Sequence, residues 1–419
     1  MITYRTISLC GRPLVGAAII ACGSAAQASG FAVPEVSLAG LALSNAMVAN
    51  TTEAGALPYN PAVMAFLGDG SVGLGLMTLG PSNEVSDTFL NPGASFEGEG
   101  SDWLLSGMAH GHVALGENLA LGLSVNSPFG LETVWPSEAF AAGFAAVGAA
   151  GQEPTRSKLE LISASPSMSY KINDEASLAA GFDLYWIRDL KFNTTATPIC
   201  CGTGSGIGYH LSGLFRRGDW SFGATYFSSA DVDVDEGSVG GLEANTSVDL
   251  PWRAQIGAYY QATDALGVEF DITRTGWSSF DKVEIFASDG FINAAVGGPI
   301  VTTTNNWDDV NAYRLGVTYA LSDQTDLRFG YSYDETPQDD DYFSARIPDA
   351  DRQLFSLGVS HELGSSGWDI EGGYMYVRFN DRSLDLPAPT SSEPNGTFLY
   401  NGDYESHVHL LGLGVSKRF

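Results

Sequence analysis

Apolar and polar residues alternate along most of the chain after Gly70, in segments of about ten residues. The C-terminal segment shows this well, because Leu411, Leu413, Val415 and Phe419 share one parity while small or polar residues occupy the other. A period of two is typical of a β-strand whose two faces meet different surroundings. Further segments of this kind are residues 178–186, 313–321 and 327–334. The pattern predicts a protein built mainly from β-strands.

The connections between these segments alternate between short and long. Tight turns are expected at residues 116–118, 173–175, 218–219, 263–264, 322–324 and 364–367. Longer connections are expected near residues 81–101, 136–155, 193–204, 235–244, 286–306, 334–350 and 381–403. Together they predict an all-β fold, a fourteen-stranded antiparallel transmembrane β-barrel over about residues 71–419, with both ends on the short-turn side. Strand twelve should begin near Arg352, and strand fourteen should end at Phe419.

The composition agrees with a barrel in lipid and excludes several partners. Charged residues make up 16% of the chain, against about 25% in soluble globular proteins. Asp and Glu number 49 and Lys and Arg 20, which gives a formal net charge of −29. Nucleic acid is therefore not expected as a partner, because phosphate binding needs a basic surface. We expect no cofactor and a monomer.

The first 28 residues resemble a secretory signal peptide. Arg5 and Arg12 precede a short apolar run, and Ala26-Gln27-Ala28 matches the small-x-small cleavage pattern. The alternative is a lipoprotein signal with Cys22 as the acceptor. Export together with a barrel pattern predicts the outer membrane of a Gram-negative bacterium.

Residues 29–70 lack strand alternation and are rich in Ala, Leu, Ser and Asn. A helical stretch is expected around 36–47, followed by Asn60-Pro61-Ala62. A segment of this size has no other obvious surface to cover, so we expect it to plug the barrel as a hatch. The alternative is a periplasmic tail.

Four passages resemble the FadL family of outer-membrane transporters for long-chain fatty acids and related hydrophobic compounds. They are S-G-F-A-V-P-E-V with the later Y-N-P-A, then N-S-P-F-G-L-E-T from Asn126, V-E-F-D-I-T-R-T-G-W from Val268, and I-P-D-A-D-R from Ile347. The resemblance covers essentially the whole chain after residue 28. It implies a plugged barrel that passes hydrophobic substrates sideways into the membrane, and a hatch that contains Phe31, Asn60, Pro61 and Ala62.

The third predicted strand contains a break. Proline cannot donate to a sheet ladder and glycine weakens it, and Pro128 and Gly130 stand two residues apart. The resemblance implies a lateral opening at this place, and the residues concerned are Asn126, Ser127, Pro128, Phe129 and Gly130. The alternative is a strand that simply ends at Asn126.

An apolar and helical outer loop is expected at residues 136–151. Phe140, Phe144 and Val147 have helical spacing and could form an exposed apolar face that receives substrate. The alternative is that they pack on a neighbouring loop. The apolar candidates for substrate binding are Phe129, Leu131, Trp135, Phe140, Phe144 and Val147.

A fatty acid also needs a positive charge inside the barrel. Parity places Lys191, Arg253, Arg314, Arg328 and Arg352 on the lumen face. Most should pair with lumen acids, because a buried charge needs a partner. Such acids are Asp183, Glu269, Asp271, Asp369 and Glu371. The candidates for carboxylate binding are Lys191, Arg314 and Arg328, and those for structural roles are Asp349, Asp351, Arg352 and Phe419.

The sequence contains few motifs for disulfide, metal-binding or enzymatic chemistry. Cys200 and Cys201 are adjacent and could form a vicinal disulfide or remain two thiols, and no metal site is expected from them. The acidic stretches 231–237 and 334–341 could bind Ca²⁺ or be solvated loops. We find neither G-x-S-x-G nor H-E-x-x-H in the sequence, and we expect no enzymatic activity.

Three functions compete at this point. The first is passive transport of long-chain fatty acids or similar amphiphiles, with outer-membrane lipid as the acceptor. The second is uptake of aromatic hydrocarbons or alkanes by the same fold. The third is a structural or adhesive barrel. An unpaired base beside the hatch would separate the first from the second. The terminal Phe419 is also expected to be read by the barrel assembly machinery.

Overall fold

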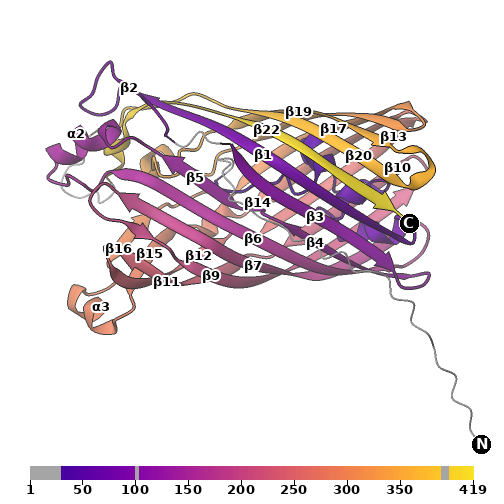
Figure 1. Cartoon of the computed structure of the whole chain (residues 1–419), viewed down its shortest axis with the longest axis horizontal. Coiled ribbons are helices and arrows are strands. Elements are labelled where there is room, and N and C mark those ends of the chain that lie inside the picture. Colours follow the sequence, from indigo (N-terminus) through magenta and orange to yellow (C-terminus); the bar gives the residue numbers. More distant parts are fainter. Residues whose placement is uncertain (1–29, 100–102, 388–395) are drawn as a thin grey trace, which may run out of the picture.

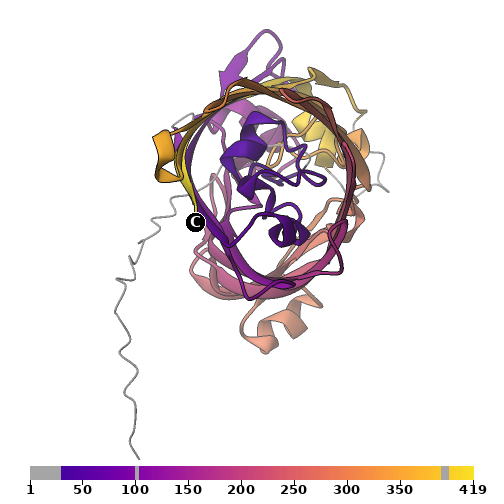
Figure 2. The same cartoon turned by 90° about the vertical axis from the view of Figure 1, so that its right-hand side faces the viewer.

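The computed structural model describes residues 30–99, 103–387 and 396–419. Its chain forms a closed antiparallel barrel of fourteen wall strands, as predicted, with the N-terminal segment inside (Figures 1 and 2). The predicted signal peptide lies outside the described residues. No helix among the described residues is long and apolar enough to cross a membrane.

Several wall strands are divided into two consecutive pieces. The strands are β1 (Gly70–Ser86), β2 (Ser95–Glu97), β3 (Leu104–Ala114), β4 (Leu119–Asn126), β5 (Gly130–Val134), β6 (Pro154–Lys171), β7 (Ala176–Thr194), β8 (Ile199–Cys200), β9 (Thr203–Arg217), β10 (Trp220–Phe227), β11 (Ala230–Val239), β12 (Leu242–Leu250), β13 (Arg253–Thr263), β14 (Leu266–Thr275), β15 (Lys282–Ala287), β16 (Val301–Thr304), β17 (Val310–Ser322), β18 (Thr325–Asp334), β19 (Arg352–Glu362), β20 (Trp368–Phe379), β21 (Arg382–Leu384) and β22 (Gly402–Arg418). The divided strands are β4–β5, β10–β11, β12–β13, β14–β15 and β16–β17. Short β2, β8 and β21 belong to the long connections.

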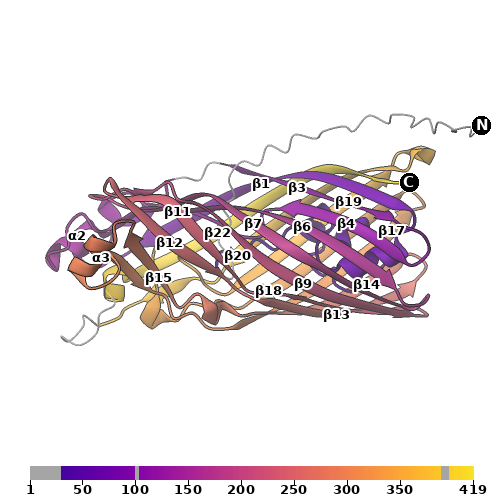
Figure 3. The same cartoon turned by 90° about the horizontal axis from the view of Figure 1, so that it is seen from below.

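The helical elements are short. They are α1 (Leu38–Ala42), η1 (Ala54–Ala56), η2 (Pro61–Phe66), α2 (Glu138–Ala146), η3 (Trp277–Ser279), α3 (Gly290–Val296), η4 (Asp340–Tyr342), η5 (Gly364–Ser366) and η6 (Gly396–Tyr400). Helices α2 and α3 lie together at the long-loop end, and the C-terminus lies at the opposite end (Figure 3).

The first and last strands close the barrel. Residues 71–86 of β1 pair with residues 403–418 of β22, and the Phe419 amide donates to the Gly70 carbonyl at 3.0 Å. The twelfth wall strand is β19, which begins at Arg352 as predicted. This closure satisfies the backbone without leaving a sheet edge in lipid.

The two faces of the wall have different side chains. Aliphatic residues point outward, and Leu413 of β22 is 71% exposed. Small residues face the hatch on the inside. A Cβ at Gly223 would lie 1.9 Å from the Val48 carbonyl oxygen, and one at Gly330 would lie 2.3 Å from the Leu43 carbonyl carbon. These glycines therefore allow the hatch backbone to lie directly against the wall.

One connection is shorter than the sequence suggested. Residues 235–244 were expected to form a long loop, but β11 and β12 are joined by Gly240 and Gly241 alone. Both glycines have positive φ, 59° and 89°, which favours glycine in a tight hairpin turn. The acidic stretch 231–237 accordingly lies in β11, where Asp231, Asp233 and Asp235 are exposed and the intervening Val232 and Val234 are buried.

The hatch fills the short-turn half of the barrel (Figure 2). Its helix α1 and the short helices η1 and η2 are largely buried. Asn60 caps η2, because its side-chain oxygen accepts from the Ala62 amide at 3.1 Å. Its amide group donates to the Val48 carbonyl at 2.6 Å and to the Gly213 carbonyl of β9 at 3.1 Å. Asn60 therefore links the hatch to the wall.

Candidate functional site

The wall is irregular between β4 and β5. Asn126 pairs with Ser163 of β6, whereas Gly130 pairs with Glu160. The three residues between them on this strand therefore stand opposite two residues of β6. Residues 126–133 are all buried, so the alternation of exposed and buried side chains stops here. The strand does not simply end at Asn126, because β5 continues along β6 after the break.

The other edge of this strand is only partly paired. Residues 120–125 of β4 pair with residues 109–114 of β3. Above them, residues 104–108 of β3 pair with β1, and among the described strands β5 pairs with β6 alone. The Glu99 amide donates to the Val134 carbonyl at 2.9 Å and ties the outer end of β5 to the first loop. The sheet ladder is thus interrupted between residues 104–108 of β3 and strand β5.

The start of the hatch binds to this break. The Val33 amide donates to the Pro128 carbonyl at 2.8 Å, and the Gly130 amide donates to the Phe31 carbonyl at 2.9 Å. Ala32 and Phe129 form the antiparallel bridge between these two bonds. Residues 31–33 therefore act as a short partner strand on the inside of the wall.

A narrow cavity lies beside the break. Val36 and Pro58 of the hatch form one side, and Asn126, Pro128 and Phe129 form another. The remaining lining residues are Ser124, Ser163, Ser165, Asp183, Tyr185, Phe227, Pro251 and Arg253. The cavity measures about 30 Å³. Hatch, break and lumen wall thus meet at one place.

Arg253 is the base that lines this cavity, at the start of β13. No carboxylate within the described ranges pairs with it, and its Nε atom is buried without an acceptor. Its guanidinium lies 4.5 Å from the ring centre of Phe227. The acid of the cavity, Asp183, accepts from Ser165 Oγ at 2.6 Å and lies 3.1 Å from His210 Nδ1. Arg253 is therefore available to an acidic ligand.

The bases named from the sequence are paired elsewhere. Arg328 binds Glu53 of the hatch at 2.6 Å, and Arg314 lies 3.5 Å from Asp334. Lys191 binds Asp189 at 2.6 Å at the long-loop end. None of the three lines the cavity beside the break. Among the lumen bases named from the sequence, Arg253 is the one that lines this cavity.

Sequence parity placed Arg253 in the lumen but did not single it out. A usable signal was present, because Arg253 follows Pro251 at a junction between two strand segments. A proline there interrupts the ladder, much as Pro128 does, and marks a second irregular point of the wall.

The predicted structural residues of the I-P-D-A-D-R motif make the expected type of contact. Arg352 binds Asp334 at 2.8 Å. Asp351 accepts from the Tyr333 hydroxyl at 2.6 Å. Asp349 accepts from the Gly30 amide at 3.0 Å and from Thr336 Oγ1 at 2.7 Å. Burial raises the pKa of Asp349. Its carboxyl group binds the backbone of Gly30, the first described residue of the hatch.

An aromatic cluster lies next to the break. The hatch residue Phe31 stands at its centre, with ring centres 5.9 Å from Phe129, 4.7 Å from Trp277, 5.0 Å from Phe280 and 6.0 Å from Trp307. Leu131 is buried in the same hydrophobic core. We call these five rings the Phe31 cluster. It adjoins the cavity of Arg253 through Phe129, which lines that cavity.

The outer helix α2 does not present the apolar face considered above. Phe140 is 1% and Phe144 is 6% exposed, whereas Val147 is 50% exposed. The two phenylalanines contact Tyr400 at 5.6 and 5.8 Å between ring centres. Trp135 lies in the same cluster and donates from Nε1 to the Ala345 carbonyl at 2.7 Å. The helix faces the loops, so the expectation of a shared exposed face is wrong.

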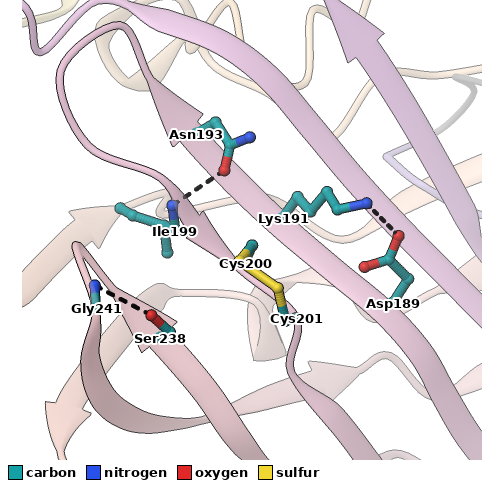
Figure 4. The surroundings of a disulfide bond; sticks show 8 residues. All are labelled: Asp189, Lys191, Asn193, Ile199, Cys200, Cys201, Ser238 and Gly241. Atoms are coloured by element: carbon teal, nitrogen blue, oxygen red, sulfur yellow. Dashed lines mark hydrogen bonds and ion pairs between the residues drawn. A yellow bond between two sulfur atoms is a disulfide. The ribbon is translucent and has the colours of Figure 1, made fainter.

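Cys200 and Cys201 form a vicinal disulfide at the long-loop end (Figure 4). Figure 4 shows the pair beside Asp189 and Lys191 of β7 and Ser238 of β11. Cys200 pairs with Ser238, and the Cys201 amide donates to the Leu190 carbonyl at 3.1 Å. An apolar pocket next to them is lined by Leu190, Phe192, Ile199, Val239, Val283 and Ile285 among others.

The short-turn end has a different character. An open cavity of about 260 Å³ lies below the hatch. Its walls carry Glu53, Asp326 and Glu371 as well as Arg328. The region is polar and offers little contact to an alkyl chain.

Comparison with known proteins agrees with this architecture. A family model described as "Outer membrane protein transport protein (OMPP1/FadL/TodX)" matches residues 19–204 and 193–419. The long-chain fatty acid transport protein of Escherichia coli is 21% identical, covering 94% of this chain and 95% of its own. The 47 kDa outer membrane protein of Pasteurella multocida is 22% identical, covering 97% and 98%.

Two solved structures show the same fold. The Pseudomonas aeruginosa FadL homologue superimposes with a TM-score of 0.75 at 18% identity, covering 93% of this chain and 99% of its own. The Pseudomonas putida toluene transporter TodX gives 0.67 at 15% identity, with the same coverage. Because the family model matches most of its length, the chain belongs to the OMPP1/FadL/TodX family of outer membrane transport proteins.

Proposed function

We propose that this protein takes up acidic amphiphiles, with long-chain fatty acids as the typical substrate, and releases them sideways through the break between β4 and β5. It acts as a passive transporter and not as an enzyme. The observation that carries the proposal is the cavity in which hatch, wall break and the unpaired Arg253 meet.

Arg253 favours an acid over a hydrocarbon. Keeping an unpaired charge in a largely buried site is costly, and a carboxylate that pairs with it removes that cost. An aromatic hydrocarbon or an alkane offers no such compensation. One solved relative is named as a toluene transporter and one relative as a fatty acid transport protein, so the family includes both names. The free guanidinium of Arg253 supports a fatty acid, rather than a hydrocarbon, as the substrate of this protein.

The route follows from the two ends of the lumen. The short-turn end is polar and faces the periplasm. Moving an alkyl chain into water costs about 0.8 kcal/mol per CH₂ group. An exit through the wall lets the chain pass from the cavity into lipid without that cost. The interrupted ladder between residues 104–108 of β3 and strand β5 is a suitable place for this exit.

The site has to widen before it holds a substrate. Its volume is about 30 Å³, whereas small-molecule pockets measure roughly 300–1,000 Å³. The two backbone bonds from residues 31–33 to the break are neutral, and such bonds contribute only about 0.5–1.5 kcal/mol each. We therefore infer that residues 31–33 move aside on binding while the rest of the hatch stays in place.

Uptake of labelled oleate and of labelled hexadecane, in cells that rely on this protein, tests the proposal. Arg253→Gln should lower oleate uptake about tenfold or more, since a hydrogen bond to a charged group contributes about 1.5–3 kcal/mol. Hexadecane uptake should not change, and Arg253→Lys should fall between the two. The exposed Arg378 of β20 provides the matched control, Arg378→Gln.

The alternatives predict other outcomes. A hydrocarbon channel would give full oleate and hexadecane uptake in Arg253→Gln. A structural barrel would give no uptake of either compound by the unmodified protein. We also propose that the protein works as a monomer, and that the barrel assembly machinery recognises its last strand through Phe419.

A further inference from the structure

A patch of charged side chains lies on the outer face of the wall, where β5, β6 and β7 pair above the break. Its bases are Arg156, Lys158, Arg188 and Lys191, and its acids are Glu132, Glu160 and Asp189. We call these residues the β6–β7 patch. Bases outnumber acids in it, whereas the whole chain has 49 acids and 20 bases. The patch is therefore a local exception to the acidic character of the protein.

A β-bulge turns Lys191 to the outside of the barrel. Residues 187 and 189 of β7 pair with the consecutive residues 161 and 160 of β6, so Arg188 is an extra residue. An extra residue reverses the face that each later side chain takes. Leu190 accordingly lies in the hydrophobic core of the lumen together with Leu159, and Lys191 faces the other way. Sequence parity alone places Lys191 in the lumen, and this placement is wrong.

The two lysines of the patch share one acid. Lys158 Nζ and Lys191 Nζ lie 3.2 and 2.6 Å from the same oxygen, Asp189 Oδ2, and Figure 4 shows the second of these pairs. The two lysines are direct cross-strand partners, and like charges in that position are destabilising. Lys158 also binds Glu160 at 3.1 Å, and the neighbouring Arg188 is exposed. Three bases thus stand beside two acids, which favours an anion from outside the protein.

The patch lies at the outer edge of the apolar band of the wall. The outward residues of β6 below it are Ile162, Ala164, Pro166, Met168 and Tyr170. Those of β7 are Leu178, Ala180, Phe182, Leu184 and Trp186. None of these side chains is charged. From Tyr170 to Glu160 the tilted strand rises by about 25 Å, which is the height of the apolar band in an outer-membrane barrel. The patch is therefore level with the head groups of the outer leaflet.

The outer leaflet offers an anion at this depth, because its main lipid in Gram-negative bacteria is a glycolipid whose sugars carry phosphate groups. Phosphate accepts through three oxygens and pairs well with Lys and Arg. We infer that the β6–β7 patch binds a phosphorylated lipid of the outer leaflet, held by Lys158, Arg188 and Lys191. The acyl chains lie along the apolar outward side chains of β6 and β7. This lipid is a resident of the membrane and not a transported substrate, so the inference does not rest on the proposed function.

Other parts of the outer face differ from the patch. Two strands further along the wall, beyond β9, the outward residues of β11 are acids that repel phosphate. They are Asp231, Asp233 and Asp235. On the outward face of β20, Arg378 is exposed, and its cross-strand partners are Gln353 and His407. Arg378 therefore provides a matched control, because it is an outward arginine that is not part of the β6–β7 patch.

Lipid binding to the purified full-length protein, measured by native mass spectrometry, tests the inference. The probes are lipid A with its phosphate groups and the same lipid after their removal. Lys158→Gln combined with Lys191→Gln should weaken binding of the phosphorylated lipid about tenfold or more and leave binding of the other unchanged. Asp189→Asn should strengthen binding of the phosphorylated lipid, because it removes the carboxylate that competes with phosphate for two ammonium groups. Arg378→Gln should have no effect.

Heat-modifiable migration in gels shows whether each barrel is folded. Equal binding of phosphorylated lipid A by the double variant and by the unmodified protein would overturn the site. If the double variant does not fold, unchanged binding by Asp189→Asn would overturn it as well. Binding that is lost with EDTA but not with the lysine substitutions would show that acids hold the lipid through a divalent cation, which contradicts the inference. Displacement of lipid A by an excess of inorganic phosphate would show an anion site without preference for a lipid, which also contradicts it.

Discussion

The start and the middle of the hatch are attached to the barrel in different ways. At residues 47–49, Asp271 Oδ2 accepts from the amides of Met47 and Val48 at 2.9 and 3.1 Å, and Glu269 Oε1 accepts from the Ala49 amide at 2.6 Å. At residues 31–33, the wall contributes two neutral backbone bonds and the packing of aromatic rings.

The difference indicates which part of the hatch can move. At residues 47–49 three backbone amides donate to two buried carboxyl groups of β14, and these groups would lose their donors while still buried if the hatch withdrew. The bonds at the wall break can be exchanged at much lower cost. The hatch is therefore best described as a fixed plug with a short movable strand at its start. Under the proposed function, a substrate would pass this strand while the rest of the hatch keeps the barrel closed.

The largest effect is expected from removing the strong attachment. Asp271→Ala leaves three buried donors without their acceptor, those of Met47, Val48 and Gln255, and each costs about 1–3 kcal/mol. We expect the plug to loosen and small hydrophilic solutes to leak through, measured as swelling of liposomes that contain the protein. Asp271→Asn keeps one acceptor oxygen and serves as the control.

A tight barrel in Asp271→Ala would break the comparison between the start and the middle of the hatch. It would mean that the carboxylates of β14 are not what holds the plug. Leakage from Asp271→Asn equal to that from Asp271→Ala would show that the charge, rather than the acceptor oxygen, is required.

A smaller effect is expected from fixing the weak attachment. Ala32 and Phe129 form a bridge pair that lies between two hydrogen bonds. Such pairs have Cα atoms about 4.5 Å apart, which is within the range that a disulfide spans. In a chain with Cys200→Ser and Cys201→Ser, the pair Ala32→Cys and Phe129→Cys should cross-link. Oleate uptake should fall about tenfold when oxidised and recover with reductant, because residues 31–33 can then no longer leave the break.

The single-cysteine variants of this pair control for the lost Phe129 ring. They should transport oleate equally well with and without reductant. Full uptake by the cross-linked protein would show that residues 31–33 do not need to move, and the hatch would then have no movable strand at this point.

Much of the barrel could be predicted from the sequence because its determinants are local. The alternation around Leu411 and Leu413 indicates directly which face of the strand contacts lipid. Pro128 indicates a break in its own strand. The lumen charges are different. Arg328 is paired with Glu53, a residue 275 positions away, and no local pattern contains that contact. Parity places a base inside the barrel but does not say which acid reaches it.

The outer loops illustrate a second limit. Helical spacing correctly groups Phe140 with Phe144, and helix α2 is present. The direction of that face depends on Tyr400, which arrives from the last long connection. In the same way, the pairing of residues 31–33 with the wall break joins two segments about a hundred residues apart. Only the three-dimensional arrangement reveals both contacts.

Lateral exit at the break is tested most directly by repairing the strand and measuring labelled oleate uptake. Three residues oppose two at this place, so deletion of Ser127 combined with Pro128→Val and Gly130→Val should restore a continuous ladder. The double substitution without the deletion keeps the extra residue and serves as the control. Amide exchange of residues 104–108 and of β5 shows whether the ladder has closed. We expect a closed ladder, a normal amount of protein in the membrane, and oleate uptake reduced to that of cells without the protein. A closed ladder with undiminished uptake would contradict exit through this part of the wall.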